Sequence, residues 1–149
     1  DQSDQTLYGS CLKRIRTAQT MGQIEGILFF QGAQDAHDPV LFPNKVLKPA
    51  QWNSDFSTVI AAFRNDLNNE QLPIVFAQLG KDHQAAALPY WGVIKQQQAE
   101  INVPYTQMIK TDDLPMTGVY HFTTPSYEAL GRRFAQAYQE LVAADKPSS

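Results

Sequence analysis

The sequence contains a single cysteine, Cys11, among its 149 residues. One cysteine excludes a disulfide within the chain and any metal cluster held by several cysteines. Cys11 lies on the apolar stripe of the first predicted helix, which favours a small buried hydrophobic residue over a nucleophile. A single cysteine does not indicate whether the protein resides in a reducing or an oxidising compartment.

Long apolar runs and an excess of positive charge are also missing. No run approaches the roughly 18 residues of a transmembrane helix, so we expect no membrane span. No charged segment followed by an apolar one opens the chain, so no signal peptide is visible, although a mature secreted protein would have lost one. The net charge is −3 without a basic stripe, which argues against a nucleic-acid partner.

Several motifs of enzymes and nucleotide-binding proteins are absent as well. The eight glycines are dispersed and form no phosphate-binding loop, which argues against a small flavodoxin-like nucleotide binder. None of the scattered serines lies in a G-x-S-x-G turn. The three histidines lack helical His-x-x-x-His spacing, so the sequence predicts neither a metal site nor a cofactor.

What is present is typical of one globular domain, with 43% hydrophobic and 18% charged residues. Apolar residues spaced by three and four predict helices over 6–21, 52–67 and 125–142, and a further helix from Pro89 to Ile101. Short apolar runs predict strands over 24–31, 72–80 and 103–109. Residues 1–149 thus form a single unit of order α-β-α-β-α-β-α, and we expect 143–149 to be a loose tail.

This alternation indicates a three-layer α/β/α architecture, with parallel strands joined by right-handed helical crossovers. Three strands make a small parallel sheet. The first helix also has no preceding strand from which to cross over. The sequence therefore predicts a partial domain that belongs to a larger sheet.

The first predicted strand ends abruptly, where Ile27-Leu28-Phe29-Phe30 runs into Gln31-Gly32. A continuous apolar run is typical of a strand covered on both faces, and parallel sheets bind ligands beyond the carboxyl ends of their strands. The second strand ends similarly, at Gln78. A strand-terminal amide can donate a hydrogen bond to a developing oxyanion, or it can tie one loop to the next.

His121 is the leading candidate for acid–base chemistry, because it lies beyond the third strand and just before the last helix. His37 and His83 occupy the loops after the first and second strands, so all three histidines could gather at one edge. Loop carboxylates near the same edge are Asp35, Asp38, Asp112 and Asp113.

Three segments resemble a known enzyme family. Residues 24–36 (IEGILFFQGAQDA) resemble the IKGVLWYQGESDA block of the sialate O-acetylesterase and acetylxylan esterase families, members of the SGNH (GDSL-like) hydrolase superfamily. Residues 63–67 (FRNDL) with 72–75 (LPIV) resemble the R-x-D-L…L-P segment of these families. Residues 120–124 (YHFTT) with 130–135 (LGRRFA) resemble the closing catalytic-histidine block. The segments follow the family's order, and the likeness runs from Leu7 onward.

The resemblance implies a flavodoxin-like SGNH hydrolase fold and hydrolysis of acetyl esters on carbohydrates without a cofactor. In this family a serine attacks the ester while a histidine removes its proton. By resemblance, His121 is the general base, and Gln31 and Gly32 lie in the oxyanion and substrate-facing block. The family is compatible with a secreted or periplasmic location.

The chain also departs from the family pattern. The family's nucleophilic serine sits in a G-Q-S-N turn upstream of everything matched here, and Ser3 has no strand before it, so we find no nucleophile in this chain. The acidic partner usually lies three residues before the histidine, at Gly118 here, which leaves Asp113 or Asp112 as possible partners. The family's Q-G-E glutamate is replaced by Ala33.

Two interpretations follow. In the first, this chain is the carboxyl-terminal half of an SGNH carbohydrate esterase, and a second chain or a missing N-terminal half supplies the serine and completes the sheet. In the second, the chain is a degenerate, non-catalytic member that serves as a binding or assembly subunit. An unpaired edge strand is a docking surface, so both interpretations predict a partner.

Overall fold

The computed structural model describes residues 2–43, 47–81 and 86–144. Its principal elements confirm the predicted order α-β-α-β-α-β-α. The helices are α1 (Leu7–Gln19), α2 (Trp52–Asp66), α3 (Trp91–Ala99) and α4 (Thr124–Ala144), and the strands of the sheet are β1 (Ile27–Phe29), β2 (Ile74–Ala77) and β3 (Thr106–Ile109). Short 3-10 turns occupy Ala33–Ala36 and Pro49–Gln51.

The stretch between β3 and α4, where the sequence predicted no strand, contains a small hairpin. Its strands are β4 (Met116–Thr117) and β5 (His121–Phe122), which pair antiparallel with Thr117 opposite His121. Gly118 takes a φ of +61° in the turn, where glycine is favoured because it has no Cβ. Strands of two residues carry too little alternation to be recognised in a sequence, so this hairpin was not predicted.

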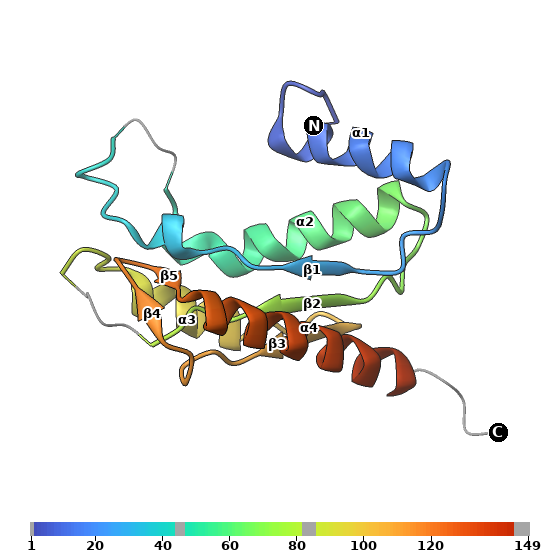
Figure 1. Cartoon of the computed structure of the whole chain (residues 1–149). Helices are drawn as coiled ribbons and strands as arrows, with labels where there is room; N and C mark the ends of the chain where they lie inside the picture. Colours follow the sequence, from blue (N-terminus) through green and yellow to red (C-terminus); the bar gives the residue numbers. More distant parts are fainter. Residues whose placement is uncertain (1, 44–46, 82–85, 145–149) are drawn as a thin grey trace.

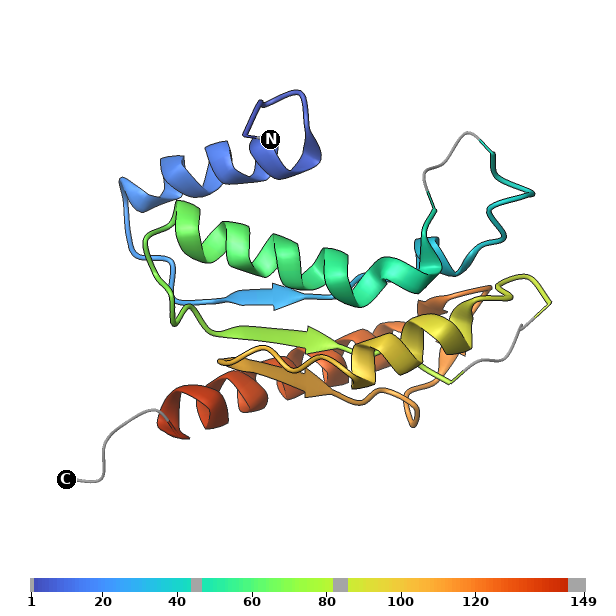
Figure 2. The same cartoon turned by 180° about the vertical axis from the view of Figure 1, so that it is seen from behind.

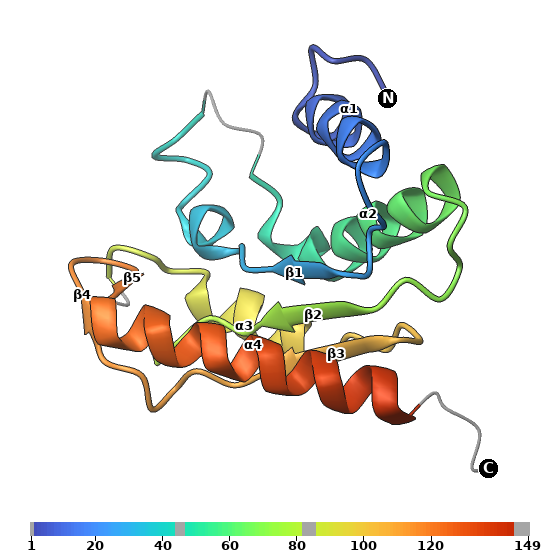
Figure 3. The same ribbon diagram turned by 45° about the vertical axis from the view of Figure 1, so that its right-hand side comes forward.

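The sheet has the order β1-β2-β3 and is parallel throughout. Helices α2 and α3 cover one face and α4 covers the other, as Figures 1 and 2 show from opposite sides. Helix α1 lies beside α2, away from α4 (Figure 3). The predicted three-layer α/β/α architecture is therefore confirmed.

The core is built on both faces of the central strand β2, whose four residues are all buried. Ile74 and Phe76 point toward α2 and α3, whereas Val75 and Ala77 point toward α4. Continuous burial of this kind is the reason that the β2 segment is an unbroken apolar run. Each buried aliphatic or aromatic side chain stabilises the fold by roughly 1.5–3 kcal/mol.

Strand β1 was also expected to be buried on both faces, but the structure differs. It pairs only with β2 among the described strands, and α4 covers β2 and β3 rather than β1. The side chain of Leu28 is consequently 59% exposed and that of Phe30 is 37% exposed. The prediction of a strand buried on both faces is thus wrong for β1, because one of its faces is only partly covered and its outer edge is unpaired among the described residues.

The prediction for Cys11 is also wrong, since its side chain is exposed. Helix α1 buries Leu12, and it contacts α2 through the ring of Tyr8, whose centroid lies 4.8 Å from that of Phe63. Leu7, on the same stripe as Cys11, is 94% exposed. The side of α1 that carries Leu7 and Cys11 therefore faces open space beside α2 and β1, whereas Leu12 is buried.

The last helix begins at Thr124, one residue before the predicted start at 125. The hydroxyl oxygen of Thr123 accepts a hydrogen bond from the backbone N–H of Ser126 and caps the helix. Tyr127, in the first turn of α4, is 42% exposed. Of the predicted loose tail, residues 143–144 are helical, and 145–149 lie outside the described residues.

Candidate active site

The end of β1 turns sharply at Gly32, which adopts a φ of +137°. A Cβ atom at this position would come within 3.0 Å of the side-chain amide of Gln98 and of Ile94 Cγ2. Both the backbone conformation and the close neighbours therefore require glycine here. The shape of the Gln31-Gly32 turn is fixed by packing from α3.

Two further glutamines connect the strand ends to each other and to α3. The Gln98 side chain, 1% exposed, donates to the backbone oxygen of Gln31 (3.1 Å) and accepts from the backbone N–H of Leu79 (2.8 Å). The Gln78 side chain donates to the backbone oxygen of Lys95 at 2.9 Å and is also buried. Two roles were considered for Gln78, an oxyanion donor and a link between two segments. The structure supports the link, because the Gln78 amide points into the protein and bonds α3.

The side-chain amide of Gln31 is held by two partners. The indole nitrogen of Trp52 donates to Gln31 Oε1 at 2.9 Å, and Gln31 Nε2 donates to the carboxylate of Asp35. Asp38, in contrast, accepts from the backbone N–H of Val40 and shapes a turn. Sequence reasoning selected Gln31 but missed Trp52 and Gln98. Gln98 lies four residues after Ile94 on the buried face of α3, and a polar residue there is the signal that could have identified it.

His121 lies on β5 with its side chain exposed. Its ring centroid is 4.6 Å from that of Tyr120, and the Tyr120 centroid is 6.1 Å from that of His37. The His37 ring also donates through Nδ1 to the backbone oxygen of Gln34 at 2.9 Å. Two of the three histidines are thus brought to one aromatic cluster, and His83 lies outside the described residues.

The two possible acidic partners of His121 are engaged elsewhere. Asp112 forms an ion pair with Lys95. Asp113 accepts from both terminal nitrogens of Arg133, with one contact at 2.8 Å, and this guanidinium holds the pKa of Asp113 below its usual value. Among the described hydrogen bonds and ion pairs, none joins either carboxylate to His121.

A largely apolar groove of about 550 Å³ opens between α1, α2 and the outer side of β1. Leu7 and Cys11 line it from α1, and the Gln31 amide lies at the β1 end. The groove explains the exposure of the α1 stripe.

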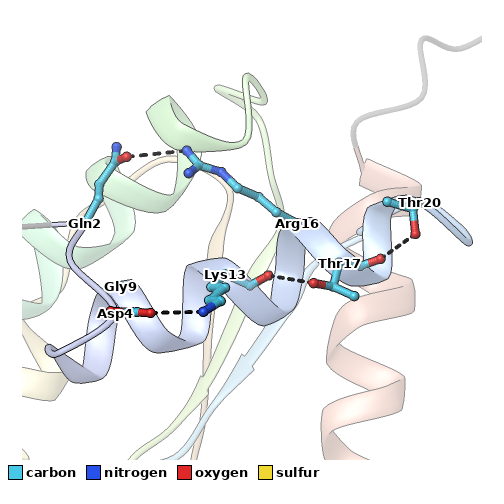
Figure 4. A pocket seen from close by; sticks show the side chains of 7 residues that line it. All are labelled: Gln2, Asp4, Gly9, Lys13, Arg16, Thr17 and Thr20. Carbon is cyan, nitrogen blue, oxygen red and sulfur yellow. Dashed lines mark hydrogen bonds and ion pairs between the residues drawn. The ribbon is translucent and has the colours of Figure 1, made fainter.

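A second hollow, on the outer side of α1, is lined by polar side chains that pair with one another (Figure 4). Asp4 accepts from Lys13 at 2.9 Å, and Arg16 reaches Gln2 at 3.5 Å. Both members of the Asp4–Lys13 pair are more than half exposed. Since their charges are already paired, we assign no function to this hollow.

The described residues include no group of three or more histidine, cysteine, aspartate or glutamate side chains placed to hold a metal ion. None of the described helices is long and apolar enough to cross a membrane.

Comparison with known proteins identifies the family. The family model for carbohydrate esterases described as sialic acid-specific acetylesterases matches residues 2–140. No match was found among curated proteins.

Two solved structures share the fold. A protein from Arabidopsis thaliana is 24% identical with a TM-score of 0.75, over 90% of this chain and 52% of that one. A carbohydrate acetylesterase from Xanthomonas citri is 19% identical with a TM-score of 0.68, over 84% of this chain and 27% of that one. The chain thus spans about half, or about a quarter, of these proteins. From its sequence match, the chain belongs to the sialic acid-specific acetylesterase family of carbohydrate esterases.

Proposed function

We propose that this chain is the carboxyl-terminal half of an SGNH-type carbohydrate O-acetylesterase domain and that it supplies the catalytic histidine, His121. The family match over residues 2–140, which includes the His121 block, carries this proposal. An exposed imidazole is accessible to a serine that arrives from outside the described chain. The substrate is an acetylated carbohydrate, and no cofactor takes part.

In the proposed reaction the serine oxygen attacks the acetyl carbonyl carbon while His121 takes the serine proton. Donors from the Gln31-Gly32 turn stabilise the resulting oxyanion. The intermediate collapses to an acyl-enzyme as the sugar hydroxyl leaves with the proton from His121. Water, activated by the same imidazole, then releases acetate and restores the serine.

The nucleophile comes from the other half of the domain, because the described serines near the core have structural partners. Ser126 is buried and donates to the backbone oxygen of Pro115 at 2.7 Å. Ser54 and Ser57 donate to backbone oxygens within and before α2.

The open edge of β1 is the proposed docking surface for that half. The backbone N–H of Ile27 donates to Pro73 on the β2 side, so the alternation of a parallel strand directs the N–H and C=O groups of Leu28 to the open edge. Helix α1 approaches β1 on the face that α2 covers. A right-handed connection on this face must come from a parallel strand beyond the open edge. Such a strand would cover Leu28 and Phe30 and fill the groove beneath α1.

An assay with p-nitrophenyl acetate tests the proposal. The 149-residue chain alone is expected to hydrolyse this ester no faster than its His121→Ala variant. Together with the nucleophile-bearing half, the wild-type chain should gain activity that His121→Ala reduces by about a hundredfold or more. Arg132→Ala, an exposed change on α4, is the control and should retain activity. Serine-dependent turnover by the isolated chain, or a completed enzyme that tolerates His121→Ala, would contradict the proposal.

A second candidate function is that of a degenerate binding or assembly subunit. The ion pairs of Asp112 and Asp113 favour it, because these carboxylates contact Lys95 and Arg133 instead of His121. In that case the completed protein would bind an acetylated carbohydrate, measured by calorimetry, without releasing acetate.

A further inference from the structure

We propose that Trp52 and Asp35 are positioning residues that fix the Gln31 side-chain amide in one orientation and leave one of its N–H groups for an external oxygen acceptor. The identity of that acceptor, the oxyanion of the ester, rests on the proposed function. The orientation itself rests only on the contacts of the three side chains.

The two partners of Gln31 make opposite demands on its amide. An indole nitrogen can only donate, so the group 2.9 Å from Trp52 Nε1 must be the Gln31 oxygen. An ionised carboxylate can only accept, so the group facing Asp35 must be the Gln31 nitrogen. Rotation of the amide by 180° would place a donor against a donor and an acceptor against an acceptor. Both contacts therefore select the same orientation.

Trp52 is itself held rigidly. Its side chain is only 5% exposed, and its ring is stacked on Phe56 with the centroids 5.0 Å apart and the planes 12° from parallel. Because the indole cannot turn within this packing, its N–H points in a fixed direction. The orientation of the Gln31 oxygen follows from the packing of α2.

The main chain of Gln31 is also fixed. Gln98, buried and bonded to Leu79, donates to the Gln31 backbone oxygen, and Gly32 has no space for a side chain. With both ends of the side chain held, one Nε2 hydrogen bonds Asp35. The second has no hydrogen-bond partner among the described residues, and it belongs to an exposed residue that borders the groove. A donor held before its acceptor arrives requires no reorganisation when charge develops.

Hydrogen exchange of the Gln31 side-chain amide, followed by ¹⁵N-edited NMR on the full chain, tests this inference without any enzymatic activity. The hydrogen bonded to Asp35 should exchange with water about tenfold more slowly than the side-chain amide of exposed Gln23. Trp52→Phe keeps an aromatic ring but removes the indole N–H, and Asp35→Ala removes the carboxylate that accepts from Gln31 Nε2. Each should bring Gln31 close to the exchange rate of Gln23.

Trp91→Phe is the matched control, since the buried indole of Trp91 donates to the backbone oxygen of Gly80 instead. It should leave Gln31 exchange unchanged. The inference is overturned if Gln31 exchanges as fast as Gln23 in the wild type, or if Trp52→Phe has no more effect than Trp91→Phe. If the Gln31 side-chain amide exchanges slowly but the His121→Ala variant of the completed enzyme stays active, the proposed function is contradicted and the inference about Gln31 stands.

Discussion

At the residue scale, Arg64 shows that part of the family-like sequence serves the fold. Its buried guanidinium donates to the backbone oxygens of Leu72, Pro104 and Tyr105 at 2.8–3.2 Å, where the chain enters β2 and β3. Burial lowers the pKa of this guanidinium. Asp66, two residues later, accepts from the hydroxyl of Tyr8 at 2.6 Å. The R-x-D-L segment thus connects α2 to two strands and to α1.

Replacement of Arg64 by methionine should lower the free energy of unfolding by about 2–3 kcal/mol, because it leaves buried carbonyl oxygens without a charged donor. Urea denaturation followed by circular dichroism measures the change. Arg14→Met, on the exposed side of α1, is the control and should shift the free energy by less than about 0.5 kcal/mol. Equal stabilities of the two variants would contradict this role of Arg64.

The exposed ion pair between Asp113 and Arg133 predicts that the stability of the fold depends on pH. Arg133 lowers the pKa of Asp113 in the folded state, so the pair stabilises the fold above the unfolded pKa, near 3.8, and this contribution disappears as the pH falls through the lower folded value. Asp113→Asn should therefore have a slightly lower urea midpoint than the wild type at pH 7. The two midpoints should converge below pH 3.8.

The exposed Glu128→Gln variant provides the comparison for the pH series. The urea midpoints of Asp113→Asn and the wild type are compared at each pH. If their difference grows as the pH is lowered, the predicted sign of this pH dependence is wrong.

At the element scale, β1 and β2 carry similar apolar sequences in opposite surroundings. Every residue of β2 is buried between α4 and the α2–α3 layer, whereas Leu28 on β1 is 59% exposed. The groove beside β1 and the side of α1 that lines it are largely apolar. Parallel sheets bury both faces of their inner strands, so β1 has the composition of an inner strand at an edge position.

Substitutions in the two strands should consequently have different effects. Phe76→Ala should lower the free energy of unfolding by about 3–5 kcal/mol, since it creates a cavity among Phe29, Phe56 and Ile74. Leu28→Lys should change it by less than about 0.5 kcal/mol in the isolated chain. The same Leu28→Lys change should weaken binding of the nucleophile-bearing half, measured by calorimetry. Unchanged binding would place the docking surface elsewhere.

At the scale of the whole molecule, the surfaces that no other described element covers lie along one side. The unpaired edge of β1, the groove under α1 and the turn that holds the Gln31 amide are contiguous. The family match, together with coverage of 52% and 27% of the solved relatives, agrees with a partial domain. In the proposed function, the second half of the domain would lie along this side, complete the sheet and bring a serine to its carboxyl edge.

The order of helices and strands was predictable from the sequence, because hydrophobic periodicity reports which side of each element is buried. The turn at Gln31-Gly32 was predictable from the end of an apolar run, although β1 itself ends at Phe29 and is shorter than the predicted strand 24–31. The β4–β5 hairpin was not, because two-residue strands show no periodicity. The burial of Cys11 was mispredicted because an apolar stripe does not reveal whether its partner is present.

The sequence by itself determined the α/β class, the parallel sheet and the family, all of which depend on local patterns and on motif order. Only the tertiary structure decided which polar side chains meet. Trp52 and Asp35 approach Gln31 from an adjacent helix and a turn, and Asp112 and Asp113 turn to Lys95 and Arg133. Hydrogen bonds and ion pairs depend on the positions of two groups in space, and the spacing of residues along a chain does not specify those positions.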